Sequence, residues 1–270
     1  MRWWDKIGWI VLLWLAAATT SVHAQSALLM ELKEQKLLSS ADHAHLSKHL
    51  ETLEKKRAEN DRAFLYRIFW STRKEFLHTY SPHQPISSLF EHGLYDCLTA
   101  TTLYAIVLEH FAYSFKIVET NYHIFILAST AKGEILLEAT DPYNGFVESS
   151  DQINNRLSSY KQNITATRKP DVVEYKFHFN IFGEVASTHL PNLLHYNQAI
   201  NAFNDQKWIK CAEHLQAARL GYSSARVKEL AALLVESVSE NSTVTDEVKD
   251  FIIAHFRNEW IEAQPLVLGR

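Results

Sequence analysis

The sequence has little cysteine, little glycine and no excess of positive charge. Two cysteines in 270 residues cannot build the disulfide framework of a small secreted domain, so each must act locally. Seven glycines and six prolines exclude a collagen-like or low-complexity chain. A net charge of −4 gives no electrostatic basis for binding nucleic acid. The chain is rich in apolar residues instead, at 47%, which over this length allows one large or two small domains with a sizeable core.

The first 24 residues have the layout of a secretory signal peptide. Arg2 and Lys6 precede an apolar run from Ile7 to Ala18, and Val22-His23-Ala24 matches a small-residue cleavage site. The run has 12 residues, whereas a transmembrane helix needs about 20. An uncleaved N-terminal anchor is the alternative. We expect cleavage after Ala24 and a secreted or periplasmic mature protein without a transmembrane segment, in a compartment that permits disulfides.

Hydrophobic patterns divide the rest of the chain into three parts. Residues 25–80 are predicted to be helical, since Leu46, Leu50 and Leu53 recur at helical spacing after Ser39. Residues 81–188 are predicted to form one domain of α+β class, because a buried helix precedes several strands. The helix is expected at 97–109, and the strands at 115–119, 122–127, 134–139 and 172–182.

Residues 189–270 return to a helical pattern. From 195 to about 223 the residues fit one helix pair of the tetratricopeptide type, with small and bulky residues at the packing positions Ala199, Phe203, Trp208, Leu215 and Ala218. Cys211 takes a small-residue position and is predicted to pack in the core. Residues 225–236 are a candidate degenerate next helix. Only one repeat is convincing, whereas stable arrays need about three. The pair therefore either docks on the preceding domain or belongs to a groove that binds a partner peptide.

Three residues in the central part have the side chains of a cysteine-dependent enzyme. Cys97 follows Asp96 at the start of the predicted helix, where backbone N–H groups are free. A thiol becomes a good nucleophile when a helix N-terminus or a histidine lowers its pKa. His123 begins a predicted strand, and Asp141 follows the next strand. A histidine can accept the thiol proton, and a carboxylate can fix the tautomer of that imidazole.

Hairpin geometry predicts that His123 and Asp141 lie close together. If Ser129 pairs with Glu134 across a loop at 129–133, His123 lies opposite Thr140, and Asp141 is one step along the ladder. Neighbouring strands are about 4.8 Å apart, so the two side chains would be within reach at one end of the sheet. A slip of one residue would matter, because side chains alternate between the two faces.

In this order the three motifs resemble the transglutaminase-like superfamily of papain-like cysteine enzymes. The resemblance covers about residues 85–150 and is carried by Cys97-Leu-Thr-Ala-Thr-Thr-Leu-Tyr-Ala, by the strand around His123 and by Glu-Ala-Thr-Asp141-Pro. The Asp-Pro-Tyr-Asn-Gly run at 141–145 is also similar to bacterial members that combine this domain with tetratricopeptide repeats. The resemblance implies a cysteine-bearing helix packed on an antiparallel sheet, with Cys97 as nucleophile, His123 as general base and acid, and Asp141 as the orienting group.

The resemblance also implies an activity. Such an enzyme attacks an amide or peptide carbonyl of a protein or peptide substrate and passes through an acyl-enzyme, with hydrolysis favoured here over cross-linking. Gln84 and Tyr95 are candidates for the oxyanion hole, beside the backbone N–H of Cys97. No cofactor is expected. His43 and His45 do not share a helix face, so no zinc site is predicted.

Two other functions fit parts of the same sequence. Tyr95-Asp96-Cys97 is similar to cell-wall peptidases of the NlpC/P60 type, although Leu98-Thr99 replaces the Ser-Gly that follows their cysteine. Alternatively, the fold is an inactive scaffold that binds a protein partner through its C-terminal helices. A Cys97–Cys211 disulfide would block the nucleophile, and we expect both thiols to be free.

Overall fold

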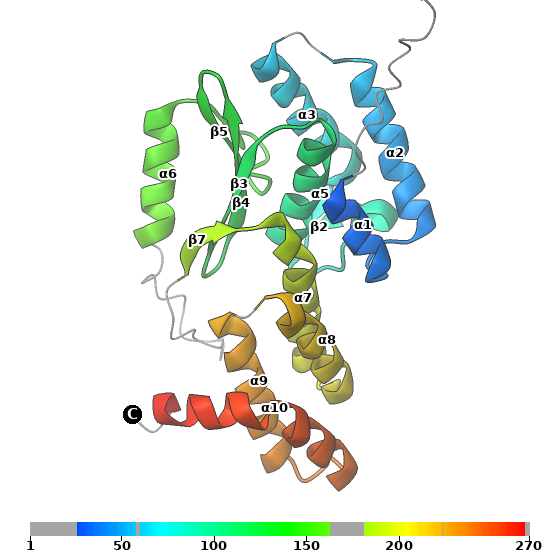
Figure 1. Ribbon diagram of the computed structural model, residues 1–270, viewed down its shortest axis with the longest axis vertical. Helices are drawn as coiled ribbons and strands as arrows, with labels where there is room; N and C mark the ends of the chain where they lie inside the picture. The colour runs from blue at the N-terminus through cyan, green and yellow to red at the C-terminus, as the bar shows by residue number, and fades with distance from the viewer. Residues whose placement is uncertain (1–25, 58–59, 163–180, 223, 268–270) are drawn as a thin grey trace, which may run out of the picture.

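The computed structural model describes residues 26–57, 60–162, 181–222 and 224–267. The predicted signal peptide and most of the predicted strand at 172–182 lie outside these residues. A sheet stands between helices on both faces, and a body of further helices lies at one end of it (Figure 1). This mixture of helices with an antiparallel sheet confirms the predicted α+β class. Within the described ranges, no helix has the length and apolar character needed to cross a membrane.

Among the residues that the structure describes, the sheet has five antiparallel strands. Its order is β6-β5-β4-β3-β7, with bounds β3 Phe115–Thr120, β4 Ile124–Thr130, β5 Gly133–Leu137, β6 Phe146–Val147 and β7 Phe182–Val185. The predicted hairpin register is confirmed, since Ser129 pairs with Glu134 and Ile126 with Leu137. The loop is shorter than expected, because β4 runs to Thr130 and β5 starts at Gly133. The register therefore fixes which side chains share a face near His123.

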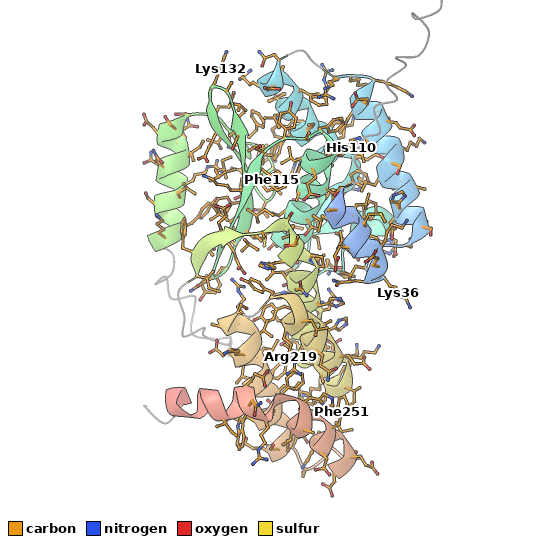
Figure 2. All side chains as sticks on the ribbon, in the orientation of Figure 1. Lys36, His110, Phe115, Lys132, Arg219 and Phe251 are labelled. Atoms are coloured by element: carbon orange, nitrogen blue, oxygen red, sulfur yellow. The ribbon has the colours of Figure 1, made fainter. Side chains whose placement is uncertain are left out.

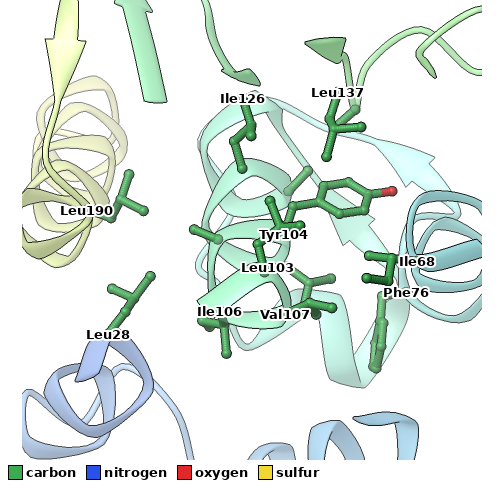
Figure 3. Close-up of a cluster of buried hydrophobic side chains, with 14 of the residues drawn as sticks. Leu28, Ile68, Phe76, Leu103, Tyr104, Ile106, Val107, Ile126, Leu137 and Leu190 are labelled. Carbon is green, nitrogen blue, oxygen red and sulfur yellow. The ribbon is translucent and has the colours of Figure 1, made fainter. Parts of the chain in front are cut away.

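Helix α5 (Cys97–His110) is the centre of the larger core. Its start is fixed by a capping box: the Asp96 carboxylate accepts the Thr99 N–H, and the Thr99 hydroxyl accepts the Asp96 N–H. Every residue from Leu98 to Leu108 is buried. Side chains from several elements surround this helix, among them Leu28, Ile68, Phe76, Ile126, Leu137 and Leu190 (Figure 3). A helix that is apolar all round must be buried on all sides, as this one is.

The N-terminal helices cover the side of α5 that faces away from the sheet. They are α1 (Ala27–Glu34), α2 (Ser40–Glu54) and α3 (Asp61–Phe76), so the predicted N-terminal helical character is confirmed. Ser39 caps α2 as the sequence indicated. The short elements β1 (Thr79–Tyr80), α4 (Ser88–His92) and β2 (Leu94–Tyr95) then lead the chain into α5, with β1 and β2 paired in parallel.

Helix α6 (Ser150–Gln162) covers the other face of the sheet. Its residues Ile153, Leu157 and Tyr160 pack with Phe125 and other side chains that point to this face: Val118, Leu127, Leu136 and Val147. Side chains fill the space between the sheet and both helical layers (Figure 2). The sheet is therefore buried on both faces over its central strands.

The described part of the C-terminal region contains four helices and has a core of its own. After the 3₁₀ turn η2 (Ser187–His189), these are α7 (Leu190–Asn204), α8 (Trp208–Gly221), α9 (Ala225–Glu240) and α10 (Asp246–Val267). The predicted helix pair corresponds to α7 and α8, and the predicted next helix is α9. Leu190, Leu193 and Leu194 at the start of α7 belong to the larger core, whereas Ala199 belongs to the second. Helix α7 thus joins the two bodies.

Candidate active site

Cys97 is the first residue of α5, directly after the capping Asp96. Its side chain is partly buried and packs against the larger core. The first N–H groups of a helix have no partner within the helix, and the helix dipole places partial positive charge there. The start of α5 therefore favours negative charge near Cys97. The Cys97 N–H also takes no part in the internal hydrogen bonds of α5.

His123 occupies the turn between β3 and β4, one residue before β4 begins. Thr120 holds the backbone of His123 on both sides, because its hydroxyl accepts the His123 N–H at 3.0 Å and donates to the His123 carbonyl at 3.1 Å. The Thr120 N–H also donates to this carbonyl, at 2.7 Å. The imidazole is therefore presented at the end of the sheet by a tightly bonded two-residue turn.

The structure brings Cys97 close to His123 and places Glu138 on the other side of the histidine. His123 Nε2 donates to Glu138 Oε2 at 2.5 Å, and Cys97 lies close enough to the imidazole to raise its pKa. Nδ1 is the ring nitrogen that is not bonded to this carboxylate. Burial alone would lower the pKa of His123, but its interactions with Cys97 and Glu138 outweigh burial and raise this pKa to about 10. The site favours a protonated imidazole beside the ionised Glu138 carboxylate.

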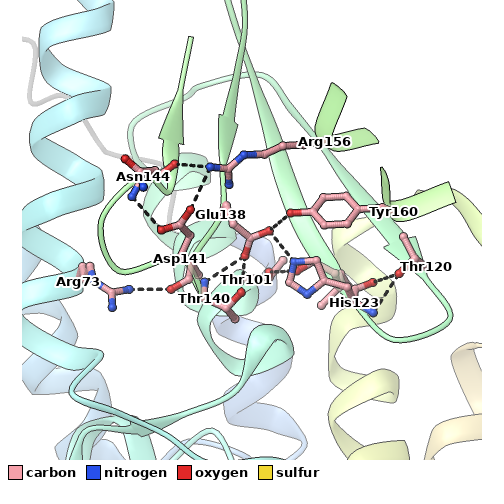
Figure 4. Close-up of polar contacts among 12 residues, drawn as sticks. Arg73, Thr101, Thr120, His123, Glu138, Thr140, Asp141, Asn144, Arg156 and Tyr160 are labelled. Carbon is pink, nitrogen blue, oxygen red and sulfur yellow. Dashed lines mark hydrogen bonds and ion pairs between the residues drawn. The ribbon is translucent and has the colours of Figure 1, made fainter. Parts of the chain in front are cut away.

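Glu138 follows β5 and is almost fully buried, with 2% of its surface exposed. The carboxylate also accepts the Tyr160 hydroxyl at 2.8 Å, and the Thr140 N–H and hydroxyl at 3.0 and 2.6 Å (Figure 4). Burial opposes ionisation of Glu138, yet the hydrogen bonds and charge of His123, followed by the Thr140 bonds, outweigh it and lower the pKa of this carboxyl. A buried carboxylate with this many donors is satisfied and fixed in direction.

The expected His123–Asp141 pairing is not what the structure contains. Asp141 accepts the N–H groups of Tyr143 and Asn144 in a turn, at 3.1 and 2.8 Å, and pairs with Arg156 of α6 at 2.9 Å (Figure 4). The ladder ends at Leu137, so the chain has already turned away before residue 141. The carboxylate that bonds to His123 is therefore Glu138, and Asp141 shapes the loop that follows.

Gly145 shows how tightly this loop closes over Glu138. The Glu138 N–H donates to the Gly145 carbonyl at 2.7 Å. A Cβ atom at position 145 would lie 2.2 Å from the Glu138 carbonyl oxygen and 2.6 Å from that of Asp141. Only glycine permits this approach of two backbone segments. The Asp-Pro-Tyr-Asn-Gly run therefore holds the start of the Glu138 segment in place.

The two side chains predicted for the oxyanion hole have other hydrogen-bond partners. The Gln84 amide donates to the Ser81 hydroxyl at 3.0 Å within its own loop. The Tyr95 hydroxyl accepts a 3.3 Å bond from Arg73, and this tyrosine is buried. The backbone N–H of Cys97 is thus the donor whose position, at the start of α5, best suits an oxyanion.

Arg73, which the sequence did not single out, connects the two sides of the site. From α3 its guanidinium donates to the Ala139 carbonyl at 2.7 Å as well as to Tyr95. Tyr95 precedes the Asp96–Cys97 step, and Ala139 follows Glu138. One side chain therefore spans the segments that carry Cys97 and Glu138.

The second cysteine has a different environment. Cys211 lies in the first turn of α8, is completely buried, and is not in a disulfide; neither is Cys97. Burial raises the pKa of the Cys211 thiol to about 12. Elsewhere in the helical region, His195 and His214 approach each other with their Nδ1 atoms 3.1 Å apart. Over the described residues, no cluster of three or more potential metal ligands is present.

Glu138, Tyr160 and Thr140 complete the site, and the hairpin register contained a signal for the first. With Ser129 opposite Glu134, the residue opposite His123 is Thr140, and same-face neighbours differ by two. Residues 138 and 140 share the face of His123, whereas residue 141 falls on the other. Strict alternation therefore pointed to Glu138. Tyr160 lies on α6, 22 residues further on, where only the tertiary fold brings it close.

Comparisons of the chain with protein-family models, with curated proteins and with solved structures found no match.

Proposed function

We propose that the protein is an exported cysteine enzyme of the transglutaminase-like class, which hydrolyses amide or peptide bonds through an acyl-enzyme. The observation that carries the proposal is the placement of Cys97 close to His123, whose Nε2 is bonded to the buried carboxylate of Glu138. A helix-borne cysteine, a histidine at the start of a strand and a carboxylate after the next strand follow one another in the order that the class uses. Glu138 takes the place expected for Asp141.

In the mechanism that we propose, Cys97 reacts as a thiolate beside a protonated His123. The pKa of His123, raised to about 10, keeps its ring protonated at neutral pH as long as the thiolate and the Glu138 carboxylate flank it. A thiolate, not a thiol, is the reactive form of cysteine. The nucleophile and the proton that the leaving group needs are therefore adjacent in the site.

Acylation follows directly from this pair. Sγ of Cys97 bonds to the carbonyl carbon, and the C=O π electrons move onto oxygen, where the Cys97 N–H stabilises the charge. When the tetrahedral intermediate collapses, the C–N bond breaks and the leaving nitrogen takes the proton from His123. The products are a free amine, a thioester on Cys97 and a neutral imidazole.

Deacylation reverses the proton transfers. Neutral His123 accepts a proton from water as the water oxygen bonds to the thioester carbonyl. The C–S bond then breaks, which releases a carboxylic acid and restores the thiolate and imidazolium. Throughout, Glu138 holds the imidazole by Nε2 and compensates its charge, while Tyr160 and Thr140 hold Glu138. An amine in place of water would give transamidation by the same steps.

The test is turnover on a protein mixture with both acceptors present. Casein is incubated with the purified mature protein in H₂¹⁸O containing monodansylcadaverine, and peptides are read by mass spectrometry. We expect new carboxyl groups that carry ¹⁸O, produced by wild type but not by Cys97→Ala. Dansylated glutamine side chains would assign the amine as acceptor instead.

The matched control is Cys211→Ala, which removes the other thiol and should leave turnover unchanged. Equal peptide patterns for wild type and Cys97→Ala would contradict the enzyme proposal and favour an inactive scaffold. Release of peptides from purified peptidoglycan, with casein left intact, would assign the chemistry to cell-wall peptides.

A further inference from the structure

We infer that the C-terminal helices are part of the framework that holds the active site, with Asn197 and Arg226 as positioning residues for Cys97 and His123. The inference rests on the proposed function for its meaning. Its evidence is separate, since it comes from hydrogen bonds between α7 or α9 and the two segments that present the reactive side chains. Neither residue touches Cys97 or His123 through any contact that the structure describes.

Asn197 of α7 acts on the nucleophile through the helix cap. Its side-chain amide donates to Asp96 Oδ2 at 2.9 Å, while Asp96 Oδ1 accepts the Thr99 N–H at 2.7 Å. Asp96 is buried, and burial raises the pKa of its carboxyl against the opposing effect of its bonds with Thr99. Asn197 therefore donates to Asp96 Oδ2, the carboxylate oxygen that does not accept the Thr99 N–H. Without this bond, Asp96 would be held less firmly. Because Asp96 caps α5, the start of the helix and the position of Cys97 would then be less well fixed.

The same helix also holds the loop before the site. The amides of Gln198 and Asn201 both donate to the His83 carbonyl, at 3.1 and 2.5 Å. His83 has a positive φ of 55°, a conformation that non-glycine residues adopt only when their surroundings fix it. Three side chains of α7 therefore bond to the segments that precede Cys97.

Arg226 of α9 acts on the histidine through its turn. Its guanidinium pairs with Glu119 at 3.1 Å and donates to the Thr120 carbonyl, and both groups belong to the end of β3. Tyr222, just after α8, donates its hydroxyl to the same Glu119 carboxylate. Thr120 is the residue whose hydroxyl and N–H hold the backbone of His123. Arg226 thus reaches His123 through a single intermediate residue.

Burial makes this second contact rigid. The Arg226 and Glu119 side chains are only 12% and 4% exposed, so neither charge can turn to water if the other moves. The helical region is consequently bonded to both halves of the site at once, to the cysteine side by α7 and to the histidine side by α9. A small displacement of these helices changes the distance between the two reactive groups, and an error near 1 Å can cost about a hundredfold in rate.

The experiment compares two positioning variants with two matched controls in the full mature chain. Asn197→Ala and Arg226→Lys remove one contact each, and the lysine keeps a charge for Glu119 so that the chain still folds. The controls are Asn192→Ala and Arg219→Ala. Asn192 donates to Ala217 at 3.0 Å, and Arg219 pairs with Glu259 at 3.1 Å, so both bonds lie inside the helical region (Figure 2 shows Arg219 there).

Three readouts are taken for every variant: the alkylation rate of Cys97 by iodoacetamide, the low-field NMR signal of the His123–Glu138 proton, and the midpoint of urea unfolding. We expect both positioning variants to slow alkylation about tenfold, and Arg226→Lys also to shift the proton signal. The controls should change only the unfolding midpoint.

Equal alkylation rates in positioning and control variants, or losses that simply follow the unfolding midpoint, would overturn the inference. Failure of the proposed function has a different signature: wild-type Cys97 would then react no faster than a thiol in an unstructured peptide. In that event the His123–Glu138 proton still reports whether Arg226 holds the histidine.

Discussion

The two cysteines lie at similar places in their helices and have opposite properties. Cys97 is the first residue of α5, and Cys211 is in the first turn of α8. Cys97 is partly exposed and lies close to the His123 imidazole, whereas Cys211 is buried among apolar side chains, and this burial raises the pKa of its thiol to about 12. A position near the start of a helix therefore does not by itself give a thiol a polar, accessible environment. The histidine and the access to solvent make the difference.

Removing the histidine should abolish most of that difference. We expect His123→Ala to lower the rate of Cys97 alkylation at pH 6.5 by about a hundredfold or more, because the thiolate loses its neighbouring counter-charge. The measurement is quantitative mass spectrometry of both cysteine peptides after timed exposure to iodoacetamide. Cys211 should stay unlabelled in both proteins, and a Cys97 rate that survives the substitution would contradict the assigned pair.

The carboxylate behind the histidine can be identified with two isosteric substitutions. Glu138→Gln should lower turnover and Cys97 alkylation by about a hundredfold, since it removes the charge that holds the imidazolium. Asp141→Asn should leave both within about twofold and cost about 1 kcal/mol or less in stability, because its Arg156 partner is partly exposed.

The opposite order of effects in these two variants would restore Asp141 as the orienting group. Urea unfolding of both proteins provides the control, since a large loss of stability in Glu138→Gln alone would separate a folding defect from a catalytic one.

A smaller effect is expected at Tyr160. Its hydroxyl bonds to Glu138 at 2.8 Å, and its ring lies 5.2 Å from that of His123. Tyr160→Phe keeps the ring packing and removes the hydrogen bond, so we expect turnover to fall about five- to tenfold, in line with a lost bond to a charged group. Steady-state kinetics should place the loss in kcat. Arg156→Ala, which acts on Asp141, is the neighbouring control and should show no such loss.

As the pH is lowered, we expect Cys211 to become exposed before the Cys97 site is disturbed. Burial, followed by the charge of His214, lowers the pKa of His195 to about 4, and burial lowers that of His214 also. Between pH 6.5 and about 4 the unfolded chain binds more protons than the folded one, so the packing of α7 on α8 loses stability as pH falls.

The probe for this prediction is 4,4′-dithiodipyridine, which reacts with thiols in acid. Cys211 should become accessible as the pH is lowered from 6.5 to 4, and His195→Gln should move this exposure to lower pH. Cys211 protection that does not change over this range would show that the histidine pair does not control the packing of the two helices.

Local sequence patterns predicted the elements that carry the chemistry. The start of α5, the hairpin register and the α7–α8 pair all follow from capping, alternation and helical spacing, which act over a few residues. The partner of His123 was predicted wrongly because Asp141-Pro142 drew attention to a familiar motif, although the face alternation of the confirmed register favours residue 138. Alternation of side chains between the two faces of the hairpin places Glu138, and not Asp141, on the face of His123.

The framework around the site could not be predicted in this way. Asn197 is 101 residues from Asp96, and Arg226 is 106 residues from Thr120. Their side chains are ordinary residues on amphipathic helices until the tertiary fold brings them to the cap of α5 and the turn before β4. Such contacts depend on how α7 and α9 lie against the sheet, which no spacing within one element determines.

The most direct test of the central claim is the pH dependence of alkylation at both cysteines in the same sample. Wild-type protein is treated with iodoacetamide between pH 5 and 9, and the two cysteine peptides are quantified. If Cys97 and His123 form a thiolate–imidazolium pair, Cys97 reacts rapidly and almost independently of pH from 6 to 8, while Cys211 remains protected. A Cys97 rate that is slow at pH 6 and rises tenfold per pH unit, as for an isolated thiol, would contradict the account.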